Sequence, residues 1–456
     1  MALLCLPLLF SCQDETPSEE VETGDEVNQW IERILRDHYL WYDELPDESS
    51  LDFNADPEDF FYSLLSDEDG KDLEEGHHYF STLEKVSSTK AILDADDSYG
   101  FEYATANVNV NGSSYPAALV LYVLKDSPAE EAGLRRGDWI YGVNGPVGTL
   151  TDYELLSNGG EVSLSLARLN SEGKLQADRT ITLDPSRAVE DTPFLKDSVY
   201  TIGGKRIGYL MYNHFSAGVD ELDNEDKSYD QELERLFRQF KSEGVTEFVL
   251  DLRYNGGGMV SSAQLLASLL APREALDDTF CQVEYNDKHS DDNLSIPFLR
   301  TTETLAGNLD LQRLYILTGS TTASSSELVI NGLIPYLGKE NVRLIGLQTF
   351  GKRVGMSVYN EAEKYGWVLS PVTFRSYNKN HEADYADGFP PDVEVNEFQQ
   401  DLVELGDTRD PLLEEAIREI TGQRQDLRSA LPSIPWQIHY DPPARLRDNL
   451  LLREEP

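Results

Sequence analysis

The segment from residue 314 to residue 327 constrains the fold most, because it reads as a buried strand that runs directly into a helix. Residues 314–317 are an apolar strand, and a helix with one apolar side begins near Ser326. The residues between them are small, and most carry a hydroxyl group. A hydroxyl at a strand-to-helix turn lies in the open beside the first N–H groups of the helix. The pattern therefore predicts an α/β unit with an exposed serine or threonine at its turn.

A serine hydroxyl is a weak nucleophile and needs a base within hydrogen-bond reach. Lys352 can be that base, since burial disfavours the charged form of a lysine. Ser324 and Lys352 bracket one helix and one short strand, 342–346, and such a connection can bring the two side chains together. An isolated serine run would be interpreted as a Ser/Thr-rich helix N-cap. The spacing to Lys352 favours the chemical interpretation.

A second strand ends in a glycine-rich string, Asp-Leu-Arg-Tyr-Asn-Gly-Gly-Gly at 251–258. The apolar strand at 245–252 leads into it, and a helix is expected from about 261 to 270. A phosphate-binding loop begins in the same way, but no Gly-Lys-Ser/Thr follows, so a nucleotide site is not predicted. Glycines instead let the backbone approach an oxyanion closely.

These strings, in this order, resemble the C-terminal processing (tail-specific) serine proteases. The family pattern is a small-residue run ending in Ser-Glu, then a helix, a strand and Thr-Phe-Gly-Lys. The resemblance implies Ser324 as the nucleophile and Lys352 as the general base of a serine-type endopeptidase. It also implies that N–H groups of Gly256 or Gly257, together with that of Ser325, stabilise the tetrahedral intermediate. It implies no metal and no cofactor.

The sequence departs from the family at one position. The family often has a glutamine four residues after the lysine, which helps to orient it, and this chain has Met356 there. A thioether makes no comparable hydrogen bonds. Two interpretations therefore stay open: a peptidase with a Ser-Lys dyad, or a weak or inactive protease-like scaffold that binds peptides or another ligand.

No histidine lies in a string that would place it beside Ser324, so a Ser-His arrangement ranks lower. The string Gly-Phe-Pro-Pro-Asp at 388–392 also resembles the family, without an assigned role.

Residues 96–185 contain short β-type runs separated by Asn-Gly turns. The string at 125–145 resembles the core of a PDZ domain, in which a peptide adds to a sheet edge while N–H groups hold its terminal carboxylate. This resemblance implies partners that are protein or peptide substrates with free C-termini. Four residues match the carboxylate loop: Tyr99, Gly100, Phe101 and Glu102. The alternative is a PDZ fold that packs as a structural module and binds nothing.

The N-terminus begins with an apolar run, residues 1–11, followed by Cys12 and an acidic stretch to about residue 25. An apolar run of this kind resembles a secretion signal. Leu-Phe-Ser-Cys at 9–12 further resembles a bacterial lipoprotein box, although no Lys or Arg precedes it. The resemblance implies lipidation of Cys12 and a location in the bacterial cell envelope, periplasmic or surface-exposed, with membrane contact through the lipid only. The alternative is a chance cysteine in a slightly apolar N-terminus.

The net charge of −45 excludes nucleic acid as a partner, because such an acidic surface repels phosphates. The three cysteines, Cys5, Cys12 and Cys281, lie too far apart for a metal cluster or a disulfide framework. Cys281 lies in an acidic segment, 277–290, that is expected to be a loop. We expect it to be an unpaired structural or surface thiol.

With 456 residues, the chain can form two or three domains. The expected fold class is multidomain α+β, with a small N-terminal helical domain, a β-rich PDZ domain and an α/β protease domain of the crotonase-like or ClpP-like kind. The N-terminal domain is expected to contain a helix from 26 to 46, ended by Pro46, and a second helix that starts at Pro57. The expected boundaries are 1–25 for signal and tether, 26–95 for the helical cap, 96–185 for the PDZ domain, 195–400 for the catalytic domain and 401–456 for a C-terminal helix and tail.

Overall fold

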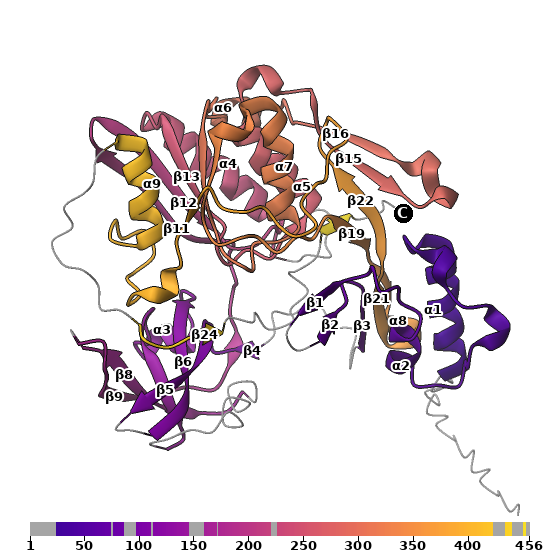
Figure 1. Ribbon diagram of the computed structural model, residues 1–456, viewed down its shortest axis with the longest axis horizontal. Coiled ribbons are helices and arrows are strands. Elements are labelled where there is room, and N and C mark those ends of the chain that lie inside the picture. Colours follow the sequence, from indigo (N-terminus) through magenta and orange to yellow (C-terminus); the bar gives the residue numbers. More distant parts are fainter. Residues whose placement is uncertain are drawn as a thin grey trace, which may run out of the picture.

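The computed structural model of the protein describes the chain in several segments. They are residues 24–73, 76–85, 97–110, 113–145, 159–170, 172–219, 226–422, 434–439 and 450–452. Figure 1 shows a helix-covered sheet at the top, a smaller β-rich part at the lower left and the N-terminal part at the right. The predicted lipidation residue Cys12 lies outside the described residues. Within these segments, no helix has both the length and the apolar character needed to cross a membrane.

The main sheet has six strands and is almost entirely parallel. Its order is β11 (Phe194–Ile202), β12 (Lys205–Tyr212), β13 (Glu247–Asp251), β17 (Leu314–Thr318), β18 (Val342–Gly346) and β23 (Val393–Glu394). Only β11 is antiparallel to its neighbour, and the register sets Leu250 beside Ile316 and Ile316 beside Leu344. The α/β arrangement expected from the apolar runs is confirmed.

Both faces of this sheet are covered, because alternate residues of its strands enter two different apolar cores. Leu250 packs with the helices on one face, whereas its neighbour Val249 packs with α9 and the PDZ sheet on the other. The first face is covered by α4 (Ser228–Ser242), α5 (Val260–Leu270), α6 (Thr302–Gly307) and α7 (Ser325–Leu337). The second is covered by α9 (Pro411–Thr421). Three short 3-10 helices connect these elements: η4 (Arg273–Ala275), η6 (Lys339–Asn341) and η7 (Glu397–Gln399).

A second sheet lies beside the helices and carries the segment that follows Lys352. Its order is β14 (Gly258–Met259), β25 (Leu450–Leu452), β19 (Val354–Ser357), β22 (Val372–Tyr377), β15 (Thr279–Tyr285) and β16 (Leu294–Pro297). The expectation of a loop at 277–290 is wrong, since β15 occupies half of it and η5 (Asp287–Asp292) forms the hairpin tip. Cys281 is fully buried in β15 and is a free thiol, which makes it structural rather than a surface group.

The N-terminal part contains the expected helix that starts at Pro57, but the helix expected to run to Pro46 ends at His38, and strands are present that the sequence pattern did not predict. Its elements are α1 (Gly24–His38), η1 (Tyr42–Glu44), η2 (Glu48–Ser50), α2 (Pro57–Tyr62), β1 (Lys71–Leu73), β2 (Gly76–His78) and β3 (Thr82–Lys85). Strand β3 joins a small sheet with β21 (Trp367–Ser370) and β20 (Tyr359–Glu361), which α8 (Ala362–Tyr365) connects. Trp30 and Phe61 are buried in one core with Met356, so this part is packed onto the protease domain.

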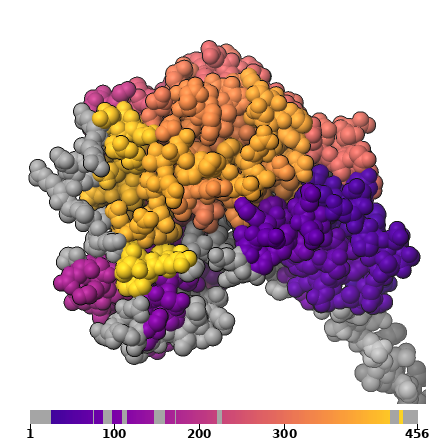
Figure 2. All heavy atoms as spheres, viewed as in Figure 1, coloured from indigo at the N-terminus to yellow at the C-terminus, as the bar shows by residue number. Residues whose placement is uncertain are grey.

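The PDZ part is a six-stranded antiparallel sheet that includes a strand from the far end of the chain. Its order is β24 (Ile438–His439), β5 (Phe101–Val110), β6 (Ser113–Val123), β7 (Trp139–Val143), β8 (Val162–Leu169) and β9 (Leu175–Leu183). Helix α3 (Pro128–Glu131) is capped by Ser127, whose side chain accepts from the N–H of Glu130. Two short antiparallel strands, β4 (Asp97–Ser98) and β10 (Arg187–Ala188), pair with each other at the start and the end of the PDZ segment. In Figure 2 the yellow atoms of β24 lie against the purple PDZ strands.

Candidate active site

Ser324 occupies the sharp turn between β17 and α7, where the backbone is strained. Its φ of 60° and ψ of −115° lie where residues with a side chain are rarely found. Such a conformation costs on the order of 1–3 kcal/mol and persists where the surrounding structure enforces it. The side chain is 1% exposed, and its Oγ forms no hydrogen bond with any described residue. A buried hydroxyl without a partner, on strained backbone, is typical of a functional site.

A single buried carboxylate ties this turn to the loop that carries Lys352. Oε2 of Glu327 accepts hydrogen bonds from the backbone N–H groups of Ser324 (3.0 Å) and Lys352 (2.8 Å). Its Oε1 accepts from Thr349 Oγ1 (2.5 Å) and the N–H of Gly351 (2.8 Å). The predicted nucleophile and base are therefore brought together through the backbone. Sequence reasoning missed Glu327, although it is the last residue of the serine run.

Burial raises the pKa of Glu327 to about 7, although its four hydrogen bonds favour the charged form and oppose the rise. Thr349, which donates to Glu327, also accepts from the N–H of Phe389 at 2.7 Å. The neighbouring Gly388 has a φ of 90°, and a Cβ there would lie 1.9 Å from the carbonyl oxygen of Thr349. The string at 388–392 thus has a structural role that sequence reasoning did not assign: it supports the Lys352 loop.

Lys352 is almost completely buried, with 2% of its side chain exposed. Its Nζ lies 3.6 Å from Sδ of Met356 and 4.9 Å from the centre of the Phe80 ring. Met356 therefore faces the amine from the position where the family often has glutamine. Phe80 comes from the N-terminal part, which therefore contributes one ring to the surroundings of the amine. Because Ser324 Oγ has no partner, the amine and the hydroxyl are not hydrogen bonded in this arrangement.

The glycine string lies directly against Ser324. Gly257 has a φ of 124°, and a Cβ there would lie 2.7 Å from Cβ of Ser324 and 3.2 Å from the backbone nitrogen of Ser325. The N–H of Gly257 already donates to Oδ1 of Asn255 at 2.9 Å. Of the three expected oxyanion donors, Gly257 is thus engaged in this arrangement, which leaves Gly256 and Ser325.

Comparison with known proteins supplies the family. The profile of the peptidase S41 N-terminal domain matches residues 26–82, that of a PDZ domain matches 119–168, and that of peptidase family S41 matches 206–395. A crystal structure of a Bacteroides fragilis protein assigned to the S41 proteases has 33% identity and a TM-score of 0.76, and the match covers 86% of this chain and 97% of that one. The protein belongs to peptidase family S41.

More distant relatives of this S41 protein are named carboxyl-terminal-processing proteases. The Synechocystis protein is 23% identical over 322 residues, which cover 66% of this chain and 65% of that one. The Picosynechococcus protein is 24% identical over 270 residues, 56% of each chain. The chain therefore spans roughly half to two thirds of the length of these relatives.

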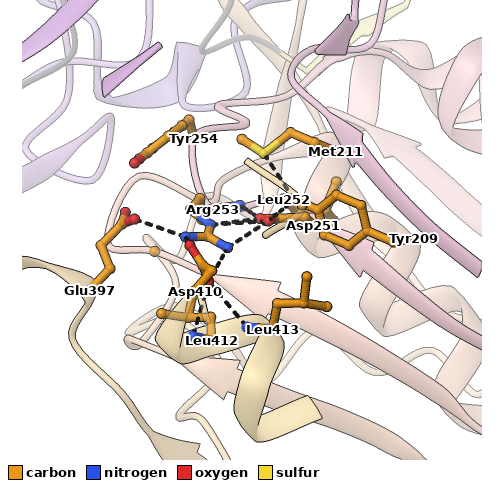
Figure 3. Close-up of polar contacts among 12 residues, drawn as sticks. Tyr209, Met211, Asp251, Leu252, Arg253, Tyr254, Glu397, Asp410, Leu412 and Leu413 are labelled. Carbon is orange, nitrogen blue, oxygen red and sulfur yellow. Dashed lines mark hydrogen bonds and ion pairs between the residues drawn. The ribbon is translucent and has the colours of Figure 1, made fainter. Parts of the chain in front are cut away.

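A cluster of buried charges connects the PDZ and peptidase parts of the S41 chain (Figure 3). The guanidinium of Arg253 contacts Asp251 at 2.7 Å, and Glu397 and Asp410 at 2.8 Å each. Arg136, from the PDZ part, contacts Glu397 at 2.6 Å. Burial is the largest influence on Asp410 and would raise its pKa, but the charge and hydrogen bonds of Arg253 and the charge of Arg136 together outweigh it, and the pKa lies below its ordinary value. The cluster joins three distant segments through fully paired charges.

The four predicted residues of the PDZ carboxylate loop lie together at the start of β5. Tyr99 is buried, and its hydroxyl is hydrogen bonded to a backbone carbonyl. The N–H of Gly100 donates to Oγ of Ser98 at 2.9 Å, so this donor is already used. Phe101 and Glu102 begin the ladder between β5 and β6. The other edge of β5 is paired with β24, opposite residues 105 and 106.

Proposed function

We propose that the protein is a serine endopeptidase of the C-terminal processing class, with Ser324 as nucleophile and Lys352 as general base. The observation that carries this proposal is the strained, buried Ser324, whose Oγ has no described partner and whose N–H shares one carboxylate oxygen with that of Lys352. Membership of peptidase family S41 supports it. The same family supports peptides or proteins as the substrate class.

The reaction needs one movement within the site. The neutral Nζ of Lys352 leaves Sδ of Met356 and comes within about 2.6–3.2 Å of Ser324 Oγ. It takes the hydroxyl proton while Oγ attacks the peptide carbonyl carbon. The resulting ammonium gives that proton to the leaving amine as the C–N bond breaks, which produces an acyl-enzyme. A water that loses its proton to the same amine then attacks the acyl carbon, and the ammonium returns that proton to Oγ of Ser324 as the ester C–O bond breaks and the acid product leaves.

Charge that develops on the carbonyl oxygen requires N–H donors at a fixed distance. The N–H groups of Gly256 and Ser325 are the predicted donors that remain, and neither donates to another described residue. Donors fixed in a water-poor site stabilise an oxyanion without reorganisation, and the loss of one costs about 10²–10³-fold in rate. The positive φ of Gly257 keeps this backbone close to Ser324.

Two strands formed by the chain's own C-terminal residues support the proposal that substrates bind as added strands. Strand β24 pairs with the edge of β5 that follows the predicted carboxylate loop. Strand β25 runs parallel between β14, which follows the glycine string, and β19, which follows Lys352. An extended peptide with a free C-terminus would use the same backbone donors and acceptors. Truncation after residue 433 should therefore increase the affinity for a C-terminal peptide, measured by fluorescence anisotropy; unchanged affinity would contradict this binding mode.

The proposal is tested by cleavage of unfolded casein, with the wild type compared with Ser324→Ala and Lys352→Ala. We expect fragments from the wild type and none above background from either variant. Cleavage by the wild type that is no faster than by the variants would exclude catalysis by this dyad.

The second candidate is a peptide-binding scaffold with little or no catalysis. The distance between Nζ of Lys352 and Sδ of Met356, 3.6 Å, favours it, because the amine faces a thioether instead of Ser324 Oγ. A scaffold would bind the C-terminal peptide in wild type and in both dyad variants, and would leave casein intact in all three.

We also propose that Cys12 is lipidated and holds the protein at the bacterial cell envelope. The lipoprotein-like string at 9–12 supports this proposal. Cys12→Ala should move the protein from the membrane fraction to the soluble fraction of cells. Unchanged fractionation would refute the anchor.

A further inference from the structure

The tip of the β15–β16 hairpin, η5, is fixed against the C-terminal end of helix α1 (Figure 1). Nδ2 of Asn286 donates to the carbonyl oxygens of Asp37 (2.9 Å) and Tyr39 (3.0 Å). Nζ of Lys288 donates to the carbonyl oxygen of Arg36 at 2.5 Å. These contacts satisfy carbonyl groups at the helix end, and they hold two segments about 250 residues apart in a defined geometry. A site formed between these two segments is therefore pre-organised.

Three side chains with metal-binding atoms meet at this junction. The ligand atoms of Asp37, His38 and His289 all lie within 4.8 Å of one another. Nε2 of His38 lies 3.5 Å from Oδ2 of Asp37, and Nε2 of His289 lies 3.4 Å from Oδ1 of the same carboxylate. These separations exceed the usual hydrogen-bond length of about 2.9–3.0 Å. With Asp37 bound through a single oxygen, the separation to that oxygen matches the edge of about 3.3–3.4 Å of a tetrahedron with metal–ligand bonds of about 2.0–2.1 Å.

The imidazole of His289 is oriented as a metal ligand. Its Nδ1 lies 3.2 Å from Oδ2 of Asp292, so a proton on Nδ1 is held by a second carboxylate. Its Nε2 is buried and forms no hydrogen bond with the part of the chain that the structure describes. A carboxylate that holds the far nitrogen of a ligating histidine is the usual support of a zinc ligand. A lone pair on Nε2 that faces a carboxylate oxygen is repulsive unless a cation lies between them.

We propose that Asp37, His38 and His289 bind one divalent transition-metal ion of the Zn²⁺ class, with Asp292 as the supporting residue. Two imidazoles and one carboxylate suit Zn²⁺, Cu²⁺ or Ni²⁺, whereas Mg²⁺ and Ca²⁺ prefer oxygen ligands only. Asp37 is about half exposed, which leaves room for water as a fourth ligand. The net charge of −45 raises the local concentration of cations around the site.

An ion here would hold the N-terminal part against the peptidase domain. The site is linked to the Phe80 ring through the hydrogen bonds of Tyr39 and Asp69. Tyr39, next to His38, donates through its hydroxyl to Oδ2 of Asp69 at 2.8 Å. Oδ1 of Asp69 accepts from the N–H of Phe80 at 3.1 Å. The ring of Phe80 lies against the amine of Lys352. Metal binding should therefore stabilise the docked N-terminal part and with it the surroundings of the amine.

The test uses the full chain, freed of metal by a chelator and titrated with Co²⁺ and then Zn²⁺ in millimolar Mg²⁺. We expect one saturable site, with the visible absorption of Co²⁺ in a tetrahedral nitrogen and oxygen environment, displacement by Zn²⁺, and a rise of the melting temperature by several degrees. His289→Ala should abolish this binding, and Asp292→Asn should weaken it by about 10–100-fold.

His381→Ala is the matched control, because His381 pairs with one carboxylate, Glu284, at 2.8 Å and belongs to no described cluster of three ligands. Its affinity for Co²⁺ should equal that of the wild type. Absence of saturable binding would overturn the proposal. So would binding that persists in both His289→Ala and the nearly isosteric Asp37→Asn, since the ion would then be held elsewhere. Circular dichroism verifies that each variant is folded before titration.

Discussion

Two buried polar clusters lie at the two ends of the glycine string 251–258: the Arg253 cluster at its start and the Ser324 cluster at its end. They differ in how completely their polar groups are hydrogen bonded. At the start of the string, every N–H of the Arg253 guanidinium has a carboxylate acceptor. At its end, Gly257 lies against Ser324, whose Oγ has no acceptor or donor among the described residues. Fully paired buried charges hold segments in place, whereas an unpaired group on strained backbone is available to a ligand. Incomplete pairing, not burial or charge, distinguishes the proposed catalytic cluster from the structural one.

The largest effect should come from removal of the amine at the unpaired cluster. Lys352→Met keeps most of the side-chain volume but cannot take a proton, so the casein cleavage rate should fall by about 10²–10⁴-fold with little change in melting temperature. Lys125→Met, at an exposed lysine of the PDZ part, is the control and should cleave normally. Cleavage by Lys352→Met at the rate of the control would show that Lys352 is not the general base.

Removal of charge at the paired cluster should affect stability. Arg253→Met leaves Asp251, Asp410 and Glu397 without their shared partner, which should cost about 3–5 kcal/mol in the free energy of unfolding. Urea denaturation measures the loss. Arg235→Met removes an arginine from an exposed pair with Glu232 and should cost about 0–1 kcal/mol. Equal losses in the two variants would mean that the buried cluster has no special structural role.

The carboxylate that links the two loops should make stability depend on pH. Because burial raises the pKa of Glu327 to about 7, from 4.5, its contribution is fully present below about pH 4.5 and falls as the pH rises to about 7. Glu327→Gln does not titrate, so this fall, on the order of 3 kcal/mol, should disappear from its pH profile.

Urea denaturation of both proteins between about pH 4.5 and pH 8 measures the difference. Asp230→Asn is a control away from the turn, because burial raises the pKa of Asp230 only to about 6 and its effect should end near that pH. Parallel pH profiles for wild type and Glu327→Gln would show that Glu327 ionises normally.

The smallest effect should come from the residue that faces the amine. Met356→Gln places an amide oxygen near Nζ of Lys352, and a hydrogen bond of about 0.5–1.5 kcal/mol that orients the amine corresponds to a rise in cleavage rate of about 2–10-fold. Met211→Gln, at another fully buried methionine, separates this gain from the general cost of a buried amide. A lower rate in folded Met356→Gln would mean that the thioether is the better neighbour.

Elements with local apolar patterns were predicted from the sequence, and contacts between distant polar groups were not. Strand β17 and helix α7 follow from short apolar runs, and they set the turn at Ser324. The role of Glu327 was not predictable, because three of its four partners, Thr349, Gly351 and Lys352, lie 22 to 25 residues further along the chain. The Arg253 cluster was missed because Glu397 and Asp410 lie about 150 residues further along the chain. The polar composition of 277–290 concealed β15, whose buried residues are few.

The most direct test of the unpaired serine is covalent labelling with a fluorophosphonate probe while the protein cleaves casein. Mass spectrometry of the digested protein identifies the labelled residue. The account predicts one adduct, on Ser324, formed far more slowly in Lys352→Met and at the normal rate in Lys125→Met. An adduct on another residue, or labelling of Ser324 that does not depend on Lys352, would contradict it.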